Sequence, residues 1–289
     1  MTVLLIPGRE RAIGAGAPVR RVLPWVHRRA VGPFVFWDHF GPEPVGEGRG
    51  LVVGEHPHIG LSTLTWMFTG EIEHRDSLGT FQVIRAGEVN WMTAGRGIAH
   101  TELGRASADG APLEGIQLWV ALPRADEQGD PSFDHRGASE LPEAWVDGVA
   151  WRVVAGALGA ARSPVPVRSP LVLADARLAD GQAASIDRPP GWELAVYVAS
   201  GRARVGGEAV DAGVMAVVDG DGPLALTAEG GAHVLLLGGA PLPEPRHLWW
   251  NFVASDPALI DAARADWAAR APRFGSVAGG LHRIDAPPR

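Results

Sequence analysis

The feature that most constrains the fold is the regular interruption of short apolar–polar stretches by glycine and proline. The chain has 38 Gly and 24 Pro in 289 residues. A strand pattern over Leu61–Phe68 is followed by turn signals at Gly70-Glu71, Gly79 and Ala86-Gly87, with short strand patterns between them. Such spacing is typical of β-sandwiches and β-barrels. The sequence therefore predicts an all-β fold.

Two stretches of this texture flank a polar, turn-rich segment, Ala125–Glu143. Before it, a strand pattern over Val31–Phe40 stops at Gly41-Pro42, and after it strand patterns resume from Leu171 onward. Since a domain contains roughly 150 residues, we expect two tandem β-barrel or jelly-roll domains, 1–135 and 145–289, joined by this segment as a linker.

The C-terminus changes character and predicts a helix. Ser255-Asp256-Pro257 offers a capping side chain followed by proline at the first helical position. Leu259, Ile260, Ala263 and Trp267 then share one face at helical spacing. We expect an amphipathic helix over about 257–270, packed on a barrel.

Composition excludes several classes of function. The absence of Cys excludes cysteine-ligated zinc, iron–sulfur clusters and thiol catalysis. A net charge of −7 without a clustered basic surface argues against direct nucleic-acid binding. No run approaches the roughly 20 apolar residues of a membrane span, and Val3–Ile6 is too short for a signal-peptide core. We therefore expect a cytoplasmic protein.

Two short motifs carry metal-binding chemistry. In a strand, residues two apart point to the same side, so His56 and His58 would lie together, as would His100 and Glu102. Either pair alone is as well explained by incidental polar residues. Together, three imidazoles and one carboxylate suit iron(II), manganese, nickel, copper or zinc, and leave coordination positions open for catalysis.

Other polar residues have a structural alternative. His74, Asp76 and Ser77 lie too close in sequence to form a catalytic triad, and we expect His74 and Asp76 to hydrogen-bond locally. Asp38-His39 would either support the metal ligands or serve local structure. Trp66 and Phe68 share the strand parity of His58, so they would either line a pocket or pack in the core.

The glycines around the histidine pairs resemble cupin motifs. Gly54-x-His56-x-His58 followed by Gly70 resembles the first motif, and Gly87, Gly95 and His100 resemble the second. Cupins usually carry a Glu soon after the second His; here Ser62 and Thr63 stand at those positions, and the carboxylate is Glu102 instead.

That displaced carboxylate is a feature of the pirin family. The stretches 56–66, 70–79, 90–102 and 249–253 resemble pirins, which are bicupins with one iron-type metal in the N-terminal barrel. The resemblance implies that His56, His58, His100 and Glu102 form a three-His, one-Glu site. Ile59 departs from the Arg that often follows His-Pro-His. The second barrel, whose His233 has no His-x-His partner, is expected to bind no metal and to act as scaffold.

The resemblance implies two roles, and a third remains open. Several bacterial pirins resemble quercetin 2,3-dioxygenase, which implies Fe(II)-dependent cleavage of a flavonol or related enol with O₂, with Glu102 as general base. Eukaryotic pirins resemble redox-responsive regulators, which implies a non-catalytic protein whose metal controls binding to a protein partner. A metal-bound fold retained for stability is the third alternative.

Overall fold

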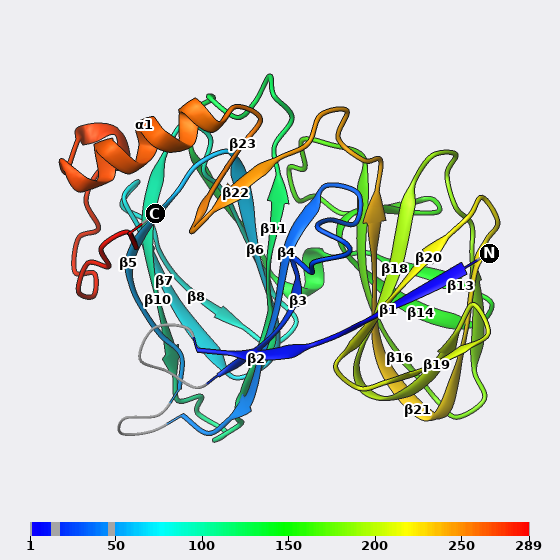
Figure 1. The fold of residues 1–289 in the computed structure, drawn as a ribbon. Helices are drawn as coiled ribbons and strands as arrows, with labels where there is room; N and C mark the ends of the chain where they lie inside the picture. Colours follow the sequence, from blue (N-terminus) through cyan, green and yellow to red (C-terminus); the bar gives the residue numbers. More distant parts are fainter. Residues whose placement is uncertain (1, 13–17, 46–49, 289) are drawn as a thin grey trace. The chain divides into compact units, whose positions relative to one another are not determined.

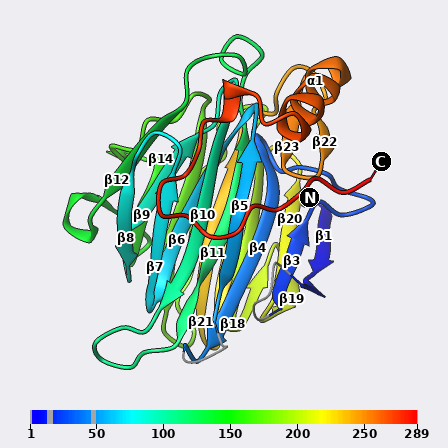
Figure 2. The same ribbon diagram turned by 90° about the vertical axis from the view of Figure 1, so that its left-hand side faces the viewer.

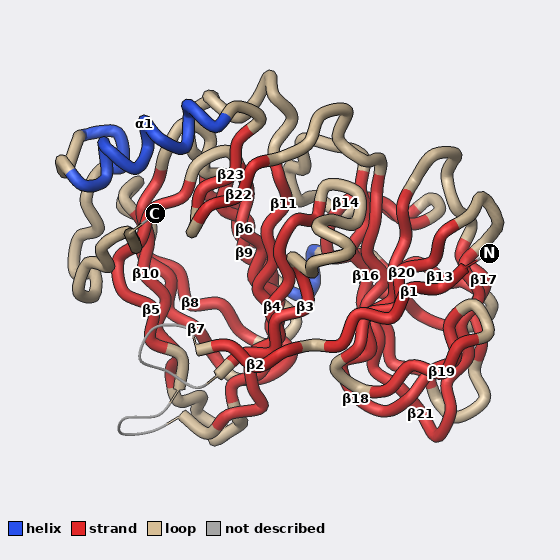
Figure 3. The backbone as a smooth tube through the Cα atoms, in the orientation of Figure 1, coloured by secondary structure: helices blue, strands red, loops and turns tan. Residues whose placement is uncertain are grey.

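The computed structural model describes residues 2–12, 18–45 and 50–288. Almost all of their regular structure is β-strand (Figure 3), which confirms the all-β prediction. Two 3₁₀ turns, Ala138–Glu140 and Pro272–Phe274, and one α-helix, α1 (Pro257–Ala268), complete the elements of this described part. None of these helices has the length and apolar character needed to cross a membrane.

Each of the two compact units contains a terminal segment from the opposite end of the chain. The N-terminal barrel consists of Arg11–Val19, Phe40–Ala138 and Pro243–Arg289, and the C-terminal barrel consists of Met1–Glu10, Arg20–His39 and Ser139–Leu242. Strand β1 (Thr2–Pro7) pairs antiparallel with β20 (Val214–Asp219), beside which it lies in blue in Figure 1. The sequence-based boundaries, 1–135 and 145–289, do not include this exchange.

Two sheets contribute strands to the N-terminal barrel. The first has the order β5 (Val52–His58), β10 (Ile98–Arg105), β7 (Glu71–Asp76), β8 (Phe81–Arg85). The second begins with β12 (Ser132–Arg136), β9 (Val89–Thr93), β6 (Leu61–Thr69) and β11 (Leu113–Ala121), and continues through β4 (Phe34–Glu43), β3 (Val19–Leu23) and β2 (Arg9–Arg11). The rings of His58 and Trp119 lie 5.3 Å apart, so the inner faces of the two sheets meet at these side chains.

Two sequence-based boundaries inside this region were wrong. The predicted linker contains β12, which pairs with β9, because Phe133 is an apolar anchor whose ring stacks on that of His74 at 4.7 Å. Strand β4 does not stop at Gly41-Pro42 but continues to Glu43. Proline is compatible with the end of a strand, where its missing N–H breaks no central ladder bond.

The C-terminal barrel is a ten-stranded sheet with an apolar interior. Its strands are β1, β20, β18 (Glu193–Val205), β21 (Leu224–Gly239), β16 (Leu171–Leu178), β14 (Val149–Leu158) and β13 (Glu143–Val146), with β15 (Ala161–Arg162), β17 (Ala183–Ile186) and β19 (Glu208–Asp211) pairing beside them. Trp151, Val196 and Leu236 are fully buried in one cluster of Val, Leu, Ile and Ala side chains. Apolar burial therefore stabilises this barrel.

The C-terminal segment packs on the N-terminal barrel. It contains the hairpin of β22 (His247–Trp249) and β23 (Phe252–Ala254) and then α1. Asp256 caps α1 by accepting a hydrogen bond from the Ala258 N–H at 2.9 Å, and the apolar face predicted from the sequence buries Trp267 against Phe274. The red end of the chain then crosses in front of β5 and β10 (Figure 2).

Candidate metal centre

Three histidines converge on the inner face of the first sheet. His56 on β5 lies directly opposite His100 on β10, and His58 follows two residues along β5. The ring centroids are 4.3 Å apart for His56 and His100, and 5.0 Å apart for His58 and either of the others. The Nε2 atoms of His58 and His100 are 3.1 Å apart. Strand alternation on β5 and the pairing of β5 with β10 thus bring together three of the four residues expected from the sequence.

Backbone carbonyls fix the orientation of two of these rings. His56 Nδ1 lies 2.7 Å from the Gly54 carbonyl oxygen, and His58 Nδ1 lies 3.1 Å from that of Asn251. A carbonyl oxygen only accepts hydrogen bonds, so each Nδ1 must carry the proton. Both neutral rings therefore present an unprotonated Nε2 to the centre of the cluster.

The predicted carboxylate, Glu102, is buried on the same strand but belongs to a second cluster. Ligand atoms of His56, His58 and His100 all lie within 4.8 Å of one another, and so do those of His74, His100 and Glu102. A register shift in the β5–β10 pairing separates His100 from Glu102, which lies opposite His74 on β7. His100 is common to both clusters. The sequence did not indicate His74 as a member, because cross-strand register decides its place.

Burial shifts the pKa values of the three histidines and of Glu102 in the direction that favours their uncharged forms. Burial lowers the pKa of His56 to about 4 and lowers the pKa values of His58 and His100 well below 6.5, with further lowering from the neighbouring imidazoles. Burial raises the pKa of Glu102, against the opposing effects of His74 and a hydrogen bond with Thr65. These three imidazoles are therefore uncharged at neutral pH, each with one protonated and one unprotonated nitrogen.

These residues fit a divalent metal ion of borderline softness. Unprotonated imidazole nitrogens are the ligands that iron, nickel, copper and zinc share, and an outer hydrogen bond on the opposite ring nitrogen is typical of metal-binding histidines. Each of the two clusters, one of His56, His58 and His100 and one of His74, His100 and Glu102, brings three ligand atoms close enough to hold such an ion. In the C-terminal barrel, His233 instead hydrogen-bonds Asp175 at 2.8 Å.

The second sheet places polar and aromatic side chains against this cluster. Thr65 on β6 donates its one hydroxyl proton to Gln117 Oε1 on β11 at 2.6 Å, and its hydroxyl lies within hydrogen-bonding reach of Glu102. Since side chains alternate along a strand, Trp66 lies on the other face of β6, where it is buried. This geometry agrees with packing of Trp66 in the core and not with lining of a pocket at the histidine cluster. Phe68, two residues further along β6, points to the same face as Trp66.

The Asp38-His39 pair has partners outside the two histidine clusters. Asp38 forms a two-point ion pair with Arg21, with both N–O distances 2.8 Å, and His39 Nδ1 lies 2.8 Å from the Tyr197 hydroxyl. Burial raises the pKa of Asp38, against the effect of Arg21. None of these three contacts involves a predicted metal ligand, so they indicate a structural role, although the partner of His39 is distant in sequence.

The C-terminal segment that supplies the Asn251 carbonyl is anchored at both ends. Arg246 donates to the Leu122 carbonyl oxygen from Nε at 3.2 Å and from Nη2 at 3.0 Å. The buried Glu127 carboxylate accepts from the Ser255 N–H at 2.9 Å and from its hydroxyl at 2.6 Å. The position of the His58 ring therefore depends on the contacts that hold the segment from Arg246 to Ser255 in place.

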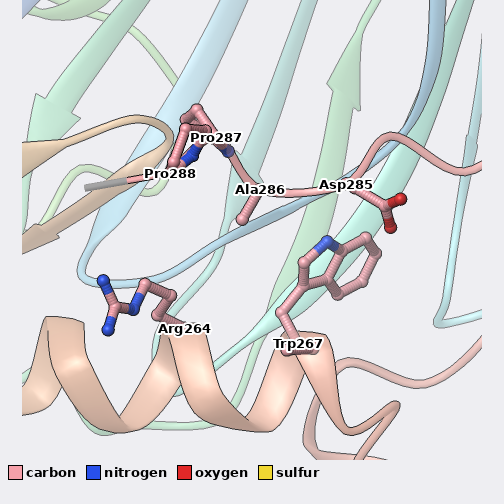
Figure 4. Close-up of a pocket in the computed structure, with 7 residues that line it drawn as sticks. Arg264, Trp267, Asp285, Ala286, Pro287 and Pro288 are labelled. Carbon is pink, nitrogen blue, oxygen red and sulfur yellow. The ribbon is translucent and has the colours of Figure 1, made fainter.

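A separate pocket lies between α1 and the last residues of the chain. Its lining includes Arg264, Trp267, Asp285 and Pro287 (Figure 4). Trp267 donates from Nε1 to the Ile284 carbonyl oxygen at 3.0 Å. None of the residues of either histidine cluster lines this pocket.

Both barrels of the chain match known protein families. Residues 16–120 match the family model Pirin, and residues 173–275 match the Pirin C-terminal cupin domain. A Pseudomonas aeruginosa protein named "Putative quercetin 2,3-dioxygenase" is 42% identical over 285 residues, which are 98% of this chain and 89% of that protein. A pirin-like protein of Caulobacter vibrioides is 43% identical over 274 residues, which are 93% of this chain and 94% of the relative.

Solved structures show the same fold. The crystal structure of a quercetin 2,3-dioxygenase from Acinetobacter baumannii superposes with a TM-score of 0.92 at 38% identity, covering 99% of this chain and 95% of the other. A bacterial pirin from Escherichia coli, solved with nickel(II), gives a TM-score of 0.66 at 18% identity, covering 83% of this chain and 100% of the other; that similarity concerns the fold alone. With both cupin domains matched and relatives aligned over nearly its whole length, the chain belongs to the pirin family.

Proposed function

We propose that the chain is a metal-dependent dioxygenase that cleaves a flavonol, or a related enol or aromatic compound, with O₂ in the manner of quercetin 2,3-dioxygenase. The observation that carries this proposal is the convergence of three neutral, buried imidazoles beside a carboxylate whose pKa burial raises. The names of similar proteins support the same chemistry.

His56, His58 and His100 would hold the metal ion, with Glu102 as the fourth ligand. A divalent ion, Fe(II) first and Mn(II), Ni(II), Cu(II) or Zn(II) as alternatives, supplies Lewis-acid chemistry that lowers the pKa of an enol hydroxyl. The register shift after His100 interrupts the β5–β10 ladder just before Glu102. Such irregularities are common next to active sites, where they redirect a side chain.

Glu102 is the residue that would accept the substrate's hydroxyl proton. A carboxylate whose pKa is raised by burial is a stronger proton acceptor than one in water. Thr65 lies beside this carboxylate and donates its one hydroxyl proton to Gln117 Oε1. Once Glu102 has accepted the substrate's proton, the Thr65 hydroxyl oxygen would be placed to accept a hydrogen bond from it.

Trp119 would contribute the flat apolar surface that an aromatic substrate needs. Its ring meets the His58 ring edge-on, with an interplanar angle of 75° and a centroid distance of 5.3 Å. Aromatic walls with a few polar groups are typical of sites for small planar ligands. The half-buried Gln117 amide on the same face would donate to a substrate carbonyl.

Anaerobic loading with Fe(II), followed by quercetin and O₂, tests this proposal. We expect loss of the flavonol absorbance together with release of carbon monoxide, and we expect His100→Ala to abolish both. The exposed His247→Ala is the matched control and should retain full turnover. Stoichiometric metal without turnover would contradict the dioxygenase proposal and favour the partner-binding regulator that the family resemblance also implies.

A further inference from the structure

Two buried polar residues of β7 have no part in the chemistry proposed above. His74 and Asp76 are 3% and 1% exposed. They lie opposite Glu102 and His100 in the β7–β10 ladder, so both side chains point to the inner face of the sheet. Burial of such groups is tolerated only when their hydrogen bonds are satisfied.

The two residues form a hydrogen-bonded chain that ends at a predicted metal ligand. His74 Nε2 lies 3.1 Å from Asp76 Oδ2, which confirms the local hydrogen bond expected from the sequence. His74 Nδ1 lies 3.4 Å from His100 Nδ1. The Phe133 ring stacks on the His74 ring at an interplanar angle of 27°, which restricts its rotation.

The far end of this chain is fixed by backbone. Asp76 Oδ1 accepts hydrogen bonds from the Leu78 N–H at 2.9 Å and from the Thr80 N–H at 3.1 Å. Both donors belong to the turn that joins β7 to β8. The other carboxylate oxygen, Oδ2, therefore remains directed at His74, and a carboxylate can only accept from it.

The positions of the protons along the chain follow from these contacts. Asp76 requires the His74 proton to be on Nε2, which leaves His74 Nδ1 as an acceptor. His100 can then donate from Nδ1, and its Nε2, which faces His58 Nε2 at 3.1 Å, is left with a lone pair for a metal. His56 and His58 obtain the same state from backbone carbonyls; His100 obtains it from a side chain.

We propose that His74 and Asp76 are positioning residues, which fix the tautomer and the ring orientation of His100 so that it binds the metal through Nε2. The inference rests on the proposed metal-binding role of His100. In this proposal His74 supports a ligand and does not itself bind the metal. The distances within the cluster of His74, His100 and Glu102 would equally permit direct coordination by His74.

Long-range ¹H–¹⁵N spectra of the full chain loaded with Zn(II) test the tautomers without any catalytic turnover. We expect metal-shifted Nε2 resonances for His56, His58 and His100, a protonated Nδ1 on His100, and a protonated Nε2 with a free Nδ1 on His74. A metal-shifted Nδ1 on His74 would make it a ligand and overturn the proposal.

Variants of His74 and Asp76 distinguish a positioning role from direct metal coordination and from a purely structural role. In His74→Gln, the amide oxygen can accept from His100 and the amide nitrogen can donate to Asp76, so Zn(II) affinity should stay within about threefold of the original. His74→Leu should lose about 10–100-fold, the usual cost of removing such an outer partner. Asp76→Asn should lose a similar factor because its amide donor forces His74 into the wrong tautomer.

The matched control is Arg75→Gln, between the two residues but on the other face of β7, which should bind Zn(II) as the unchanged chain does. Thermal unfolding of each metal-free variant identifies any loss that comes from misfolding, and the Gln and Asn variants stay informative if the Leu variant does not fold. Equal affinity in all variants would overturn the inference. Absence of Zn(II) binding in the unchanged chain would instead overturn the proposed metal function.

Discussion

His58 Nδ1 lies 3.1 Å from the backbone carbonyl oxygen of Asn251, a residue 193 positions further along the chain. The carbonyl fixes which nitrogen of His58 carries the proton, and so makes Nε2 available to a metal. The C-terminal segment therefore takes part in the candidate metal centre through its backbone, a contribution that no side-chain motif in the sequence indicates.

Loosening the anchor of this segment should weaken metal binding at a distance. Glu127→Ala removes both hydrogen bonds to Ser255, and hydrogen bonds to a charged group are worth about 1.5–3 kcal/mol each. We expect a lower free energy of unfolding and a several-fold loss of Zn(II) affinity, measured by urea titration and by chelator competition. Ser255→Ala, which removes one bond, should have a smaller effect; unchanged affinity in both would contradict the coupling.

Gly60 should tolerate no side chain, because the same segment runs against it. Its φ is +66°, and an added Cβ would lie 1.9 Å from the Val253 carbonyl oxygen. Gly60→Ala should lower the free energy of unfolding by more than about 2 kcal/mol and reduce metal affinity. Gly79→Ala is the control, since φ there is +88° but an added Cβ meets nothing within 4 Å. Its cost should be backbone strain alone, about 1–2 kcal/mol. Equal losses would contradict the steric argument.

The metal-free protein should lose stability on acidification. Unfolded histidine binds a proton near pH 6.5, whereas burial lowers the pKa of His56 to about 4 and lowers those of His58 and His100 as well. Between these values the unfolded state binds more protons, so the free energy of unfolding falls as pH falls. For His56 alone the full difference is about 3 kcal/mol.

Glu102 acts in the opposite direction, because its raised pKa contributes stability that is lost as pH rises through that pKa. Because three histidines oppose one glutamate, we expect the free energy of unfolding to fall, on balance, as pH is lowered. Urea unfolding of the metal-free chain at pH 7 and pH 5 measures it. His56→Ala should flatten the dependence and His247→Ala should not; equal or higher stability at pH 5 would be inconsistent with buried neutral imidazoles.

Replacing the base should affect the chemical step more than substrate binding. Glu102→Gln keeps a hydrogen-bonding group beside Thr65 but cannot accept a proton, so kcat on quercetin should fall about 10²–10⁴-fold at metal occupancy matched to the unchanged chain. Steady-state kinetics with metal analysis of each preparation provides the measurement. Full turnover in a metal-loaded Glu102→Gln or Glu102→Ala protein would rule out the base assignment.

The sequence was sufficient for those parts of the site that depend on neighbouring residues. Strand alternation predicted that His56 shares a strand face with His58, and His100 with Glu102, because two-residue periodicity is a local property. The capped helix near 257 was likewise readable from Asp256 and Pro257. Cross-strand register is not local, and so the relation of His74 to Glu102 and His100 became visible only in the β7–β10 ladder.

Long-range pairing also explains what the linker and domain predictions missed. The segment around Phe133 is polar in composition, yet one aromatic ring and a free edge of β9 suffice to draw it into the sheet as β12. The pairing of β1 with β20 and the contact of Asn251 with His58 join residues about 200 positions apart. No periodicity in either segment specifies its partner.

The exchange of terminal segments has a consequence for biosynthesis. The N-terminal barrel needs Pro243–Arg289, and the C-terminal barrel needs Met1–Glu10, so neither can be excised as one uninterrupted fragment. During translation the ribosome delivers His56, His58 and His100 long before Asn251. The N-terminal barrel therefore reaches its final form only after Asn251 and the segment around it have also been made.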